Sequence, residues 1–167
     1  GVLAHPATSN EEGALLARLA DGLGSGNLDH RIGNRDFSDA AVAEPFAVPL
    51  AQIEQADVIV VLGSNLRHEL PLLHARIRKA RMQRQARVYS INPVDFDFAF
   101  DQAGKQIVAP SGFAAALADA ALREAVQGAA GRAVLIVGAL VENHPQAAAL
   151  RAAARDFAAA TGAALCR

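Results

Sequence analysis

The sequence has very little sulfur and few aromatic residues: it contains one cysteine, Cys166, one methionine and no tryptophan in 167 residues. A single thiol forms no disulfide within the chain. It also supplies too few ligands for an iron–sulfur cluster or a structural zinc site held by cysteines of this chain alone. Sites of these kinds are therefore excluded.

Long hydrophobic runs and an excess of one charge are also missing. No apolar segment reaches the roughly 20 residues that span a bilayer, and nothing resembles a signal peptide. The 16 Lys and Arg against 17 Asp and Glu give a formal net charge of −1, so no overall field favours nucleic acid or a membrane surface. We expect a cytoplasmic, globular protein that neither binds nucleic acid nor inserts into a membrane.

The two ends of the sequence carry short apolar stubs. The sequence starts at Gly1 rather than Met, Val2-Leu3 follows at once, and residues 163–165 form a similar stub near the other end. Each stub resembles a piece of a strand. We expect 1–167 to be a single α/β domain excised from a longer chain.

Short apolar segments alternate with helical segments along the chain. Strands are expected over 57–62, 87–92, 106–109 and 133–138, with a short one over 28–32; helices are expected over 49–55, 71–85, 113–126 and from about 145 to 162. Strands that are apolar throughout are typical of a parallel sheet covered on both faces. The sequence therefore predicts an α/β, Rossmann-like three-layer domain with a mainly parallel sheet.

The first helix is expected to begin at a capping box formed by Ser9 and Glu12. It should bury Leu15, Leu16 and Leu19 and end at the glycine cluster of residues 22–26. A dinucleotide-binding fingerprint needs glycines that leave a strand and open a helix, whereas these close one. The cluster therefore indicates a helix end and a turn.

Several reactive residue types lack the spacing that chemistry requires. The acidic run 95–101 has neither the central glycine nor the closing glutamate of a calcium loop, and its alternating phenylalanines indicate an extended amphipathic segment. The histidines are scattered, and the serines lack the strained elbow of a nucleophile. We predict no catalytic residue and no metal ligand among His5, His30, His68, His74, His144, Ser64, Ser90, Ser111 and Cys166.

A basic segment lies in the helix expected over 71–85. No acidic residue occurs between Glu69 and Asp95. Cations near a helix C-terminus are favoured by its dipole, and a solvated face is the simpler interpretation. The alternative is a docking face for an acidic neighbour, formed by Arg76, Arg78, Lys79, Arg81 and Arg84.

Two turns follow neighbouring predicted strands. Gly63-Ser64-Asn65 comes after the strand over 57–62, and Asn92-Pro93 ends the next one. Open α/β sheets bind ligands at the carboxyl ends of their strands. A glycine there lets a phosphate approach the backbone, and an asparagine can bind a sugar or a base. The pattern indicates a nucleotide-type pocket without indicating a reaction.

These motifs resemble those of the molybdopterin oxidoreductase family over nearly the whole chain. That family carries a strand, a G-S-N-P-type turn, a helix and a second strand ending in I-D-P-R, and residues 9–31 resemble its S-N-E-E helix and the D-H segment that follows. The stretches PVDFDFAF, KQIVAPSG and RIRKA resemble most the branch formed by the large iron–sulfur subunits of bacterial respiratory NADH:quinone oxidoreductases (complex I).

The resemblance implies a molybdopterin-type fold without its metal cofactor, with iron–sulfur clusters held elsewhere in the parent subunit. It implies a non-catalytic structural or assembly domain, inactive by itself, whose partners are the other subunits of the peripheral arm on the cytoplasmic side of the inner membrane. Leu66, Asn92 and Val94 depart from the family's proline, aspartate and arginine. No cofactor is therefore expected, and the vestigial turn should consist of Gly63, Ser64, Asn65 and Asn92.

Two other protein classes share part of the pattern. The central domain of thiamine-diphosphate-dependent enzymes also has a strand ending in glycine and a later strand followed by proline and acids, and it can hold an ADP-like group. A free-standing NAD-linked dehydrogenase is disfavoured because no G-x-G-x-x-G follows a strand. The S-N-E-E helix and the D-H-R segment favour the molybdopterin family over both.

Overall fold

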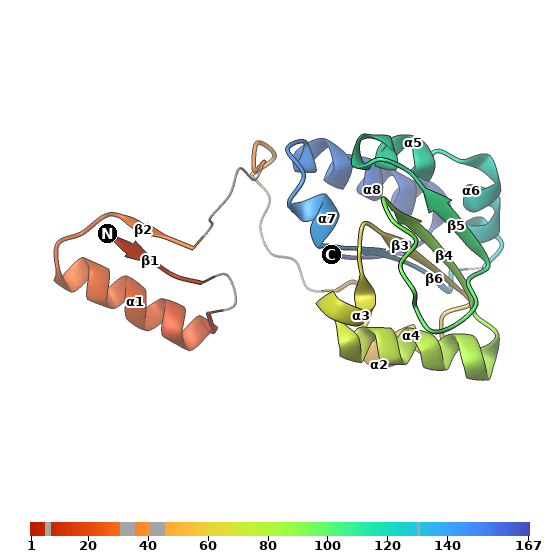
Figure 1. Cartoon of the computed structure of the whole chain (residues 1–167), viewed down its shortest axis with the longest axis horizontal. Coiled ribbons are helices and arrows are strands. Elements are labelled where there is room, and N and C mark those ends of the chain that lie inside the picture. Colours follow the sequence, from red (N-terminus) through yellow and green to blue (C-terminus); the bar gives the residue numbers. More distant parts are fainter. Residues whose placement is uncertain (6–7, 31–35, 41–45, 130) are drawn as a thin grey trace. The chain divides into compact units, whose positions relative to one another are not determined.

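The structure is a computed structural model of residues 1–167 (Figure 1), which describes every residue except 6–7, 31–35, 41–45 and 130. Contacts divide the chain into two compact units, Gly1–Arg35 and Asp36–Arg167. The expectation of one domain over 1–167 stays a prediction.

The first unit is a small βαβ arrangement. Strand β1 (Val2–Leu3) pairs in parallel with β2 (Leu28–Asp29), and helix α1 (Asn10–Gly22) connects them. The capping box is confirmed, because the Ser9 amide donates to the Glu12 carboxylate over 3.0 Å and the Glu12 amide donates to Ser9 Oγ over 3.2 Å. The strand predicted over 28–32 is found at 28–29, and its last two residues lie outside the described part.

The predicted burial of the α1 leucines is wrong. Leu15 and Leu19 are 63% and 53% exposed, Leu16 is half-buried, and Ala20 is the buried residue of this helix. A ladder of two residue pairs offers too little apolar surface to cover the leucine side of a helix. The amphipathic pattern is real, but this unit does not bury it.

The second unit contains a five-stranded parallel sheet in the order β5-β4-β3-β6-β7. Its strands are β3 (Val58–Leu62), β4 (Arg87–Asn92), β5 (Gly104–Ile107), β6 (Ala133–Val137) and β7 (Ala164–Cys166). The predicted strands over 57–62, 87–92 and 133–138 are confirmed, while the one expected over 106–109 begins earlier, at Gly104. The C-terminal apolar stub is strand β7.

Helices cover both faces of this sheet (Figure 1). One layer contains α2 (Leu50–Ile53), α3 (Leu66–Glu69) and α4 (Pro71–Arg84), and the other contains α5 (Phe113–Leu117), α6 (Ala120–Gln127), α7 (Ala139–Glu142) and α8 (Ala147–Thr161), with a 3-10 turn η1 (Pro110–Gly112) before α5. The α/β three-layer prediction is therefore confirmed.

The helix predicted over 113–126 is broken into two. The chain leaves the helical path after Leu117, and the Asp119 carboxylate accepts a hydrogen bond from the Leu122 amide over 2.8 Å. Aspartate competes for backbone amides in this way and favours a helix start over a helix interior. The alanine-rich composition alone gave no sign of the break.

The core consists of two apolar clusters, one on each face of the sheet. Side chains alternate along each strand, so that Val60 and Leu135 pack in the cluster with Phe113. Ile59 and Ile136 belong to the other cluster, together with residues of α4. Every residue of β3 and β6 is buried, and each large apolar side chain buried in this way contributes about 1.5–3 kcal/mol.

The acidic segment after β4 lies against the second cluster. Phe98 is buried, Phe96 and Phe100 are partly buried against the same cluster, and Asp95 pairs with Lys105 over 2.7 Å. The segment is therefore amphipathic, as its alternation predicts.

Candidate functional site at the carboxyl edge of the sheet

The candidate site lies where the connections of the sheet change direction. From β3 the chain proceeds through β4 to β5 on one side, and β6 then lies on the other side of β3. Ligands of open α/β sheets bind at such a switch point, outside the carboxyl ends of the two central strands. At this switch point the turn after β3 lies beside the turn after β6, at Gly138-Ala139, while Asn92 ends the other neighbouring strand, β4.

Gly63 makes the turn after β3 possible. Its φ is +62°, in the left-handed region that glycine adopts without strain. A Cβ at this position would lie 2.8 Å from Val141 Cγ2, and the Gly63 amide donates to the Ile91 carbonyl over 2.9 Å. The glycine thus meets a packing and backbone requirement that exists without any ligand.

The two switch-point turns are in direct contact. The Gly138 amide donates to the Leu62 carbonyl over 2.9 Å, and the Leu140 amide donates to the Gly63 carbonyl over 3.0 Å. A Cβ on Gly138 would overlap the Cβ of Ser64 and lie 2.7 Å from its Cα. The crevice between the turns is therefore narrow, and only a glycine at 138 permits this approach.

The carboxylate of Glu69 bridges the two turns. Its Oε2 accepts hydrogen bonds from Ser64 Oγ over 2.8 Å and from the Ala139 amide over 3.1 Å, and its Oε1 accepts one from the Asn65 amide over 3.0 Å. Ser64 is completely buried. Hydrogen bonds to a charged acceptor are about twice as strong as neutral ones, so Glu69 ties both turns together.

Cationic support for a ligand is weak near the turn. Asn92 is buried, and its Oδ1 has no hydrogen-bond partner among the described residues. Arg67 is already paired, since its Nη1 lies 2.8 Å from Asp97 Oδ2 and 3.1 Å from the Asp97 carbonyl. The pKa of Asp97 is lowered, first by the Ala99 amide and then by Arg67.

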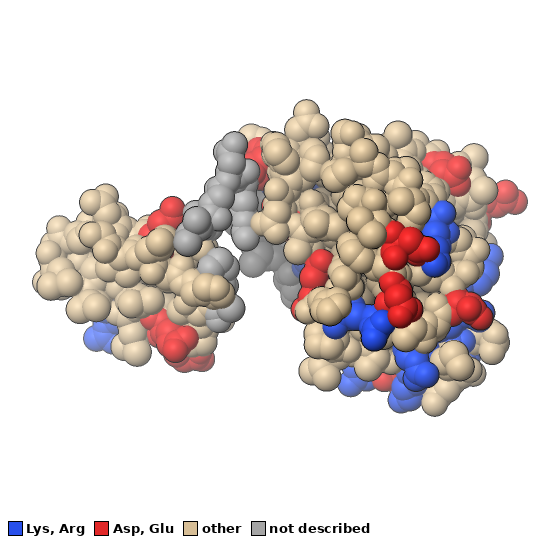
Figure 2. All heavy atoms as spheres, in the orientation of Figure 1, with Lys and Arg blue, Asp and Glu red and all other residues tan. Residues whose placement is uncertain are grey.

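Part of the predicted docking face is already paired with other residues of this chain. Arg76 and Lys79 both bind Glu54, at 2.5 Å and 2.7 Å, and the pKa of Glu54 is lowered mainly by Lys79. Arg81 donates to the Asp101 carbonyl over 2.9 Å. Figure 2 shows Lys and Arg interspersed with acidic residues on this part of the second unit. In the described part of the chain, Arg78 and Arg84 are exposed and have no ionic or hydrogen-bonded partner.

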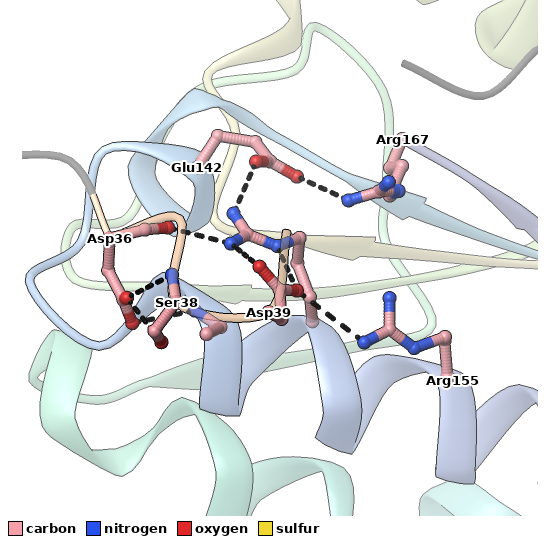
Figure 3. Close-up of polar contacts among 8 residues, drawn as sticks. Asp36, Ser38, Asp39, Glu142, Arg155 and Arg167 are labelled. Carbon is pink, nitrogen blue, oxygen red and sulfur yellow. Dashed lines mark hydrogen bonds and ion pairs between the residues drawn. The ribbon is translucent and has the colours of Figure 1, made fainter. Parts of the chain in front are cut away.

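A buried ionic cluster surrounds Arg151 of α8, a residue that sequence reasoning missed. The Arg151 side chain is 0% exposed; its Nη2 lies 2.6 Å from Asp39 Oδ1 and its Nη1 lies 3.0 Å from Glu142 Oε2. Arg155 and Arg167 approach the same two acids (Figure 3). Hydrogen bonding to Asp39 raises the pKa of Arg151.

Asp36 attaches the start of the second unit to α8. Its Oδ2 accepts a hydrogen bond from the Ala148 amide over 3.0 Å, and its carbonyl accepts one from Arg151 Nη2 over 2.7 Å. The hydroxyl of Ser38 lowers the pKa of Asp36 (Figure 3). These residues lie in a stretch that the sequence presents as irregular, so the cluster is a structural anchor between distant segments.

The described residues contain no group of three or more His, Cys, Asp or Glu placed to hold a metal ion. Cys166 is buried, and burial raises the pKa of its thiol, which disfavours the reactive thiolate. None of the helices in the described segments is long and apolar enough to cross a membrane.

Comparison with known proteins defines the family. The molybdopterin oxidoreductase family model matches residues 1–165, and the chain belongs to that family. It is 30% identical over 158 residues to the mitochondrial NADH-ubiquinone oxidoreductase 78 kDa subunit of Neurospora crassa, a match over 87% of this chain and 20% of that protein. The family resemblance expected from the turn and helix motifs is therefore confirmed.

Two further relatives are also NADH oxidoreductase subunits. Identity is 32% over 135 residues to an NADH-quinone oxidoreductase subunit of Mycobacterium tuberculosis, covering 77% of this chain and 16% of that protein. It is 39% over 67 residues to the NADH-ubiquinone oxidoreductase 75 kDa subunit of Reclinomonas americana, covering 40% and 9%. The chain thus spans a fifth or less of the length of these relatives.

Proposed function

We propose that this chain is a non-catalytic structural and assembly domain of the large iron–sulfur subunit of an NADH:quinone oxidoreductase. In this proposal the molybdopterin-type fold has lost its cofactor, and the iron–sulfur clusters lie elsewhere in the parent subunit. The partners are other subunits of the peripheral arm, on the cytoplasmic side of the inner membrane. The named relatives and the family membership support this assignment over a thiamine-diphosphate enzyme.

The proposed loss of the cofactor is supported by the contacts at the switch point. A dinucleotide would have to separate two turns that are hydrogen-bonded to each other and displace a carboxylate held by three donors. Its negative charge would also meet that of Glu69, and Arg67, which follows the turn in the sequence, is already paired with Asp97. The arrangement favours a closed structural edge over a ligand site.

Calorimetry on the full chain tests this absence of a ligand. Guanine and adenine nucleotides and a molybdopterin dinucleotide should give no heat of binding at micromolar concentrations. A dissociation constant of roughly micromolar, about 8 kcal/mol of binding, that is lost on Asn65→Ala would contradict the proposal.

The assembly role is assigned to the exposed side of α4. Among the described residues Arg78 and Arg84 have no ionic or hydrogen-bonded partner, and Leu72 and Met82 of the same helix are 80% and 58% exposed. Arg78 and Met82 are four residues apart and lie on the same side of the helix. An exposed cation next to an apolar side chain suits a partner surface that is acidic and partly apolar. Arg76, Lys79 and Arg81 then contribute less to docking, because they already have partners within the chain.

Charge reversal in the full-length parent subunit tests the docking face. The double variant R78E/R84E should weaken assembly with the neighbouring subunits, most strongly at low salt, while leaving the fold intact. R18E/R87E is the control, since it changes the charge equally on exposed arginines of α1 and β4 that have no ion pair among the described residues. Equal assembly by both variants would show that the α4 face is merely solvated.

A further inference from the structure

We infer that Glu69 is the resident anion of the switch-point crevice, so that removing its carboxylate uncovers a binding site for a small oxyanion such as formate or phosphate. This inference rests on the proposed function, because it names what occupies the site instead of a cofactor. The binding groups are Ser64 Oγ and the amides of Asn65 and Ala139.

The three donors come from both turns. Ser64 and Asn65 follow β3, Ala139 follows β6, and 70 residues of sequence separate Glu69 from Ala139. The contact is therefore a product of the fold and not a local helix cap. Ser64 is 0% exposed, so its hydroxyl is costly to leave without an acceptor when the carboxylate is removed.

The surrounding backbone holds the donors in place independently of Glu69. The Gly138 amide binds the Leu62 carbonyl, and the Leu140 amide binds the Gly63 carbonyl. The close approach of Gly138 to Ser64 fixes the distance between the turns. A variant without the carboxylate thus keeps the three donors around the space left by its two oxygens, where a small free anion can accept the same hydrogen bonds.

Chemical rescue is the experiment that tests this inference. In the full chain, Glu69→Ala should lower the thermal midpoint of the second unit by about 5 to 10 °C, because three donors lose their acceptor. Sodium formate should then raise the midpoint of E69A in a saturable manner, beyond the effect of sodium chloride at equal ionic strength. Wild-type protein should respond to the two salts alike.

Two variants serve as controls. Glu69→Gln fills the same volume and should not be rescued, because the crevice stays occupied. Glu12→Ala also removes a carboxylate that accepts a backbone amide, but in an exposed capping box, and it should gain nothing specific from formate. In E69A, formate or inorganic phosphate should shift the NMR signals of the Asn65 and Ala139 amides first.

Several outcomes overturn the inference. They are E69A as stable as wild type, a response to formate no larger than that of E12A, or amide shifts that do not include Asn65 and Ala139. If E69A does not fold alone, formate must restore its folding, and failure to do so overturns the inference as well. These results are distinct from a failure of the proposed function, which would appear as nucleotide binding by the wild-type chain.

Discussion

Both units of this chain contain parallel strands joined by a helix, but they differ in how much of that helix is buried. In residues 1–35, α1 links two parallel strands of two residues each, and leucines at positions 3, 15, 19, 23 and 28 are exposed. In residues 36–167, the same kind of crossover joins strands whose residues are buried on both faces, as in β3 and β6. Both helices α1 and α4 follow an amphipathic pattern, yet only α4 has a sheet wide enough to cover its apolar side.

This contrast shows that a helical pattern predicts which face of a helix can be buried. It does not predict whether the rest of the fold covers that face. A two-stranded ladder is marginally stable by itself, whereas three or more strands with a covered face are stable. Substitutions at matched positions of the two units therefore test this contrast.

The largest effect is expected at the buried cation of the large unit. Arg151→Ala should lower the free energy of unfolding by about 3–5 kcal/mol, because it leaves the carboxylates of Asp39 and Glu142 without their buried partner. Urea denaturation of the full chain measures it. Arg155→Ala is the control: its side chain is 43% exposed, and its loss should cost less than about 1 kcal/mol. Equal losses would show that the burial of Arg151 does not determine how much this ionic cluster contributes to the free energy of unfolding.

Replacing one large apolar residue by alanine in each of α1 and α4 compares the two helices directly. Ile77→Ala in α4 should cost about 2–5 kcal/mol of unfolding free energy, since Ile77 is 0% exposed. Leu15→Ala in α1 should change stability by no more than about 0.5 kcal/mol. Denaturation curves of the two variants provide the measurement. A cost above about 2 kcal/mol for Leu15→Ala would mean that the first unit buries this leucine in solution.

The smallest effects are expected at helix caps. The loss of stability should be similar in the two units, but it should affect different parts of the chain. Ser9→Ala and Asp119→Ala each remove a side chain that caps a helix start, at a cost of about 1 kcal/mol. For Ser9 the loss should appear as roughly fivefold faster hydrogen exchange in α1 alone. For Asp119 it should lower the stability of the whole second unit. Faster exchange throughout the chain in the Ser9 variant would show that the two units unfold together.

Much of the larger unit could be predicted because its signals are local. Strands β3 and β6 are continuous apolar segments, and α4 carries buried residues at Leu73, Ile77 and Ala80, as its periodicity predicts. The capping box at Ser9 and Glu12 spans three residues and was equally visible. The helix break at Asp119 was missed because alanine composition outweighed one capping residue in the pattern.

The candidate site was predicted only in part. Gly63, Ser64 and Asn65 do lie at the carboxyl edge of the sheet next to the end of β4, but their hydrogen-bonded contact with Gly138 and Leu140 after β6 was not predicted. Strand order sets this pairing, and the sequence does not contain strand order in any local form. Glu69 looked like an ordinary helix residue until the fold placed the Ala139 amide beside it.

Local patterns in the chain were enough to define the α/β class, the family and the main elements, because hydrophobic periodicity, turn glycines and caps act over a few residues. Which turns meet, what fills the crevice between them and where a charge is buried became visible only in three dimensions. Arg151 and Asp39 are 112 residues apart, and their contact depends on the path of the whole chain. Interactions of this kind have no sequence period, since they arise only after the sheet has brought distant segments together.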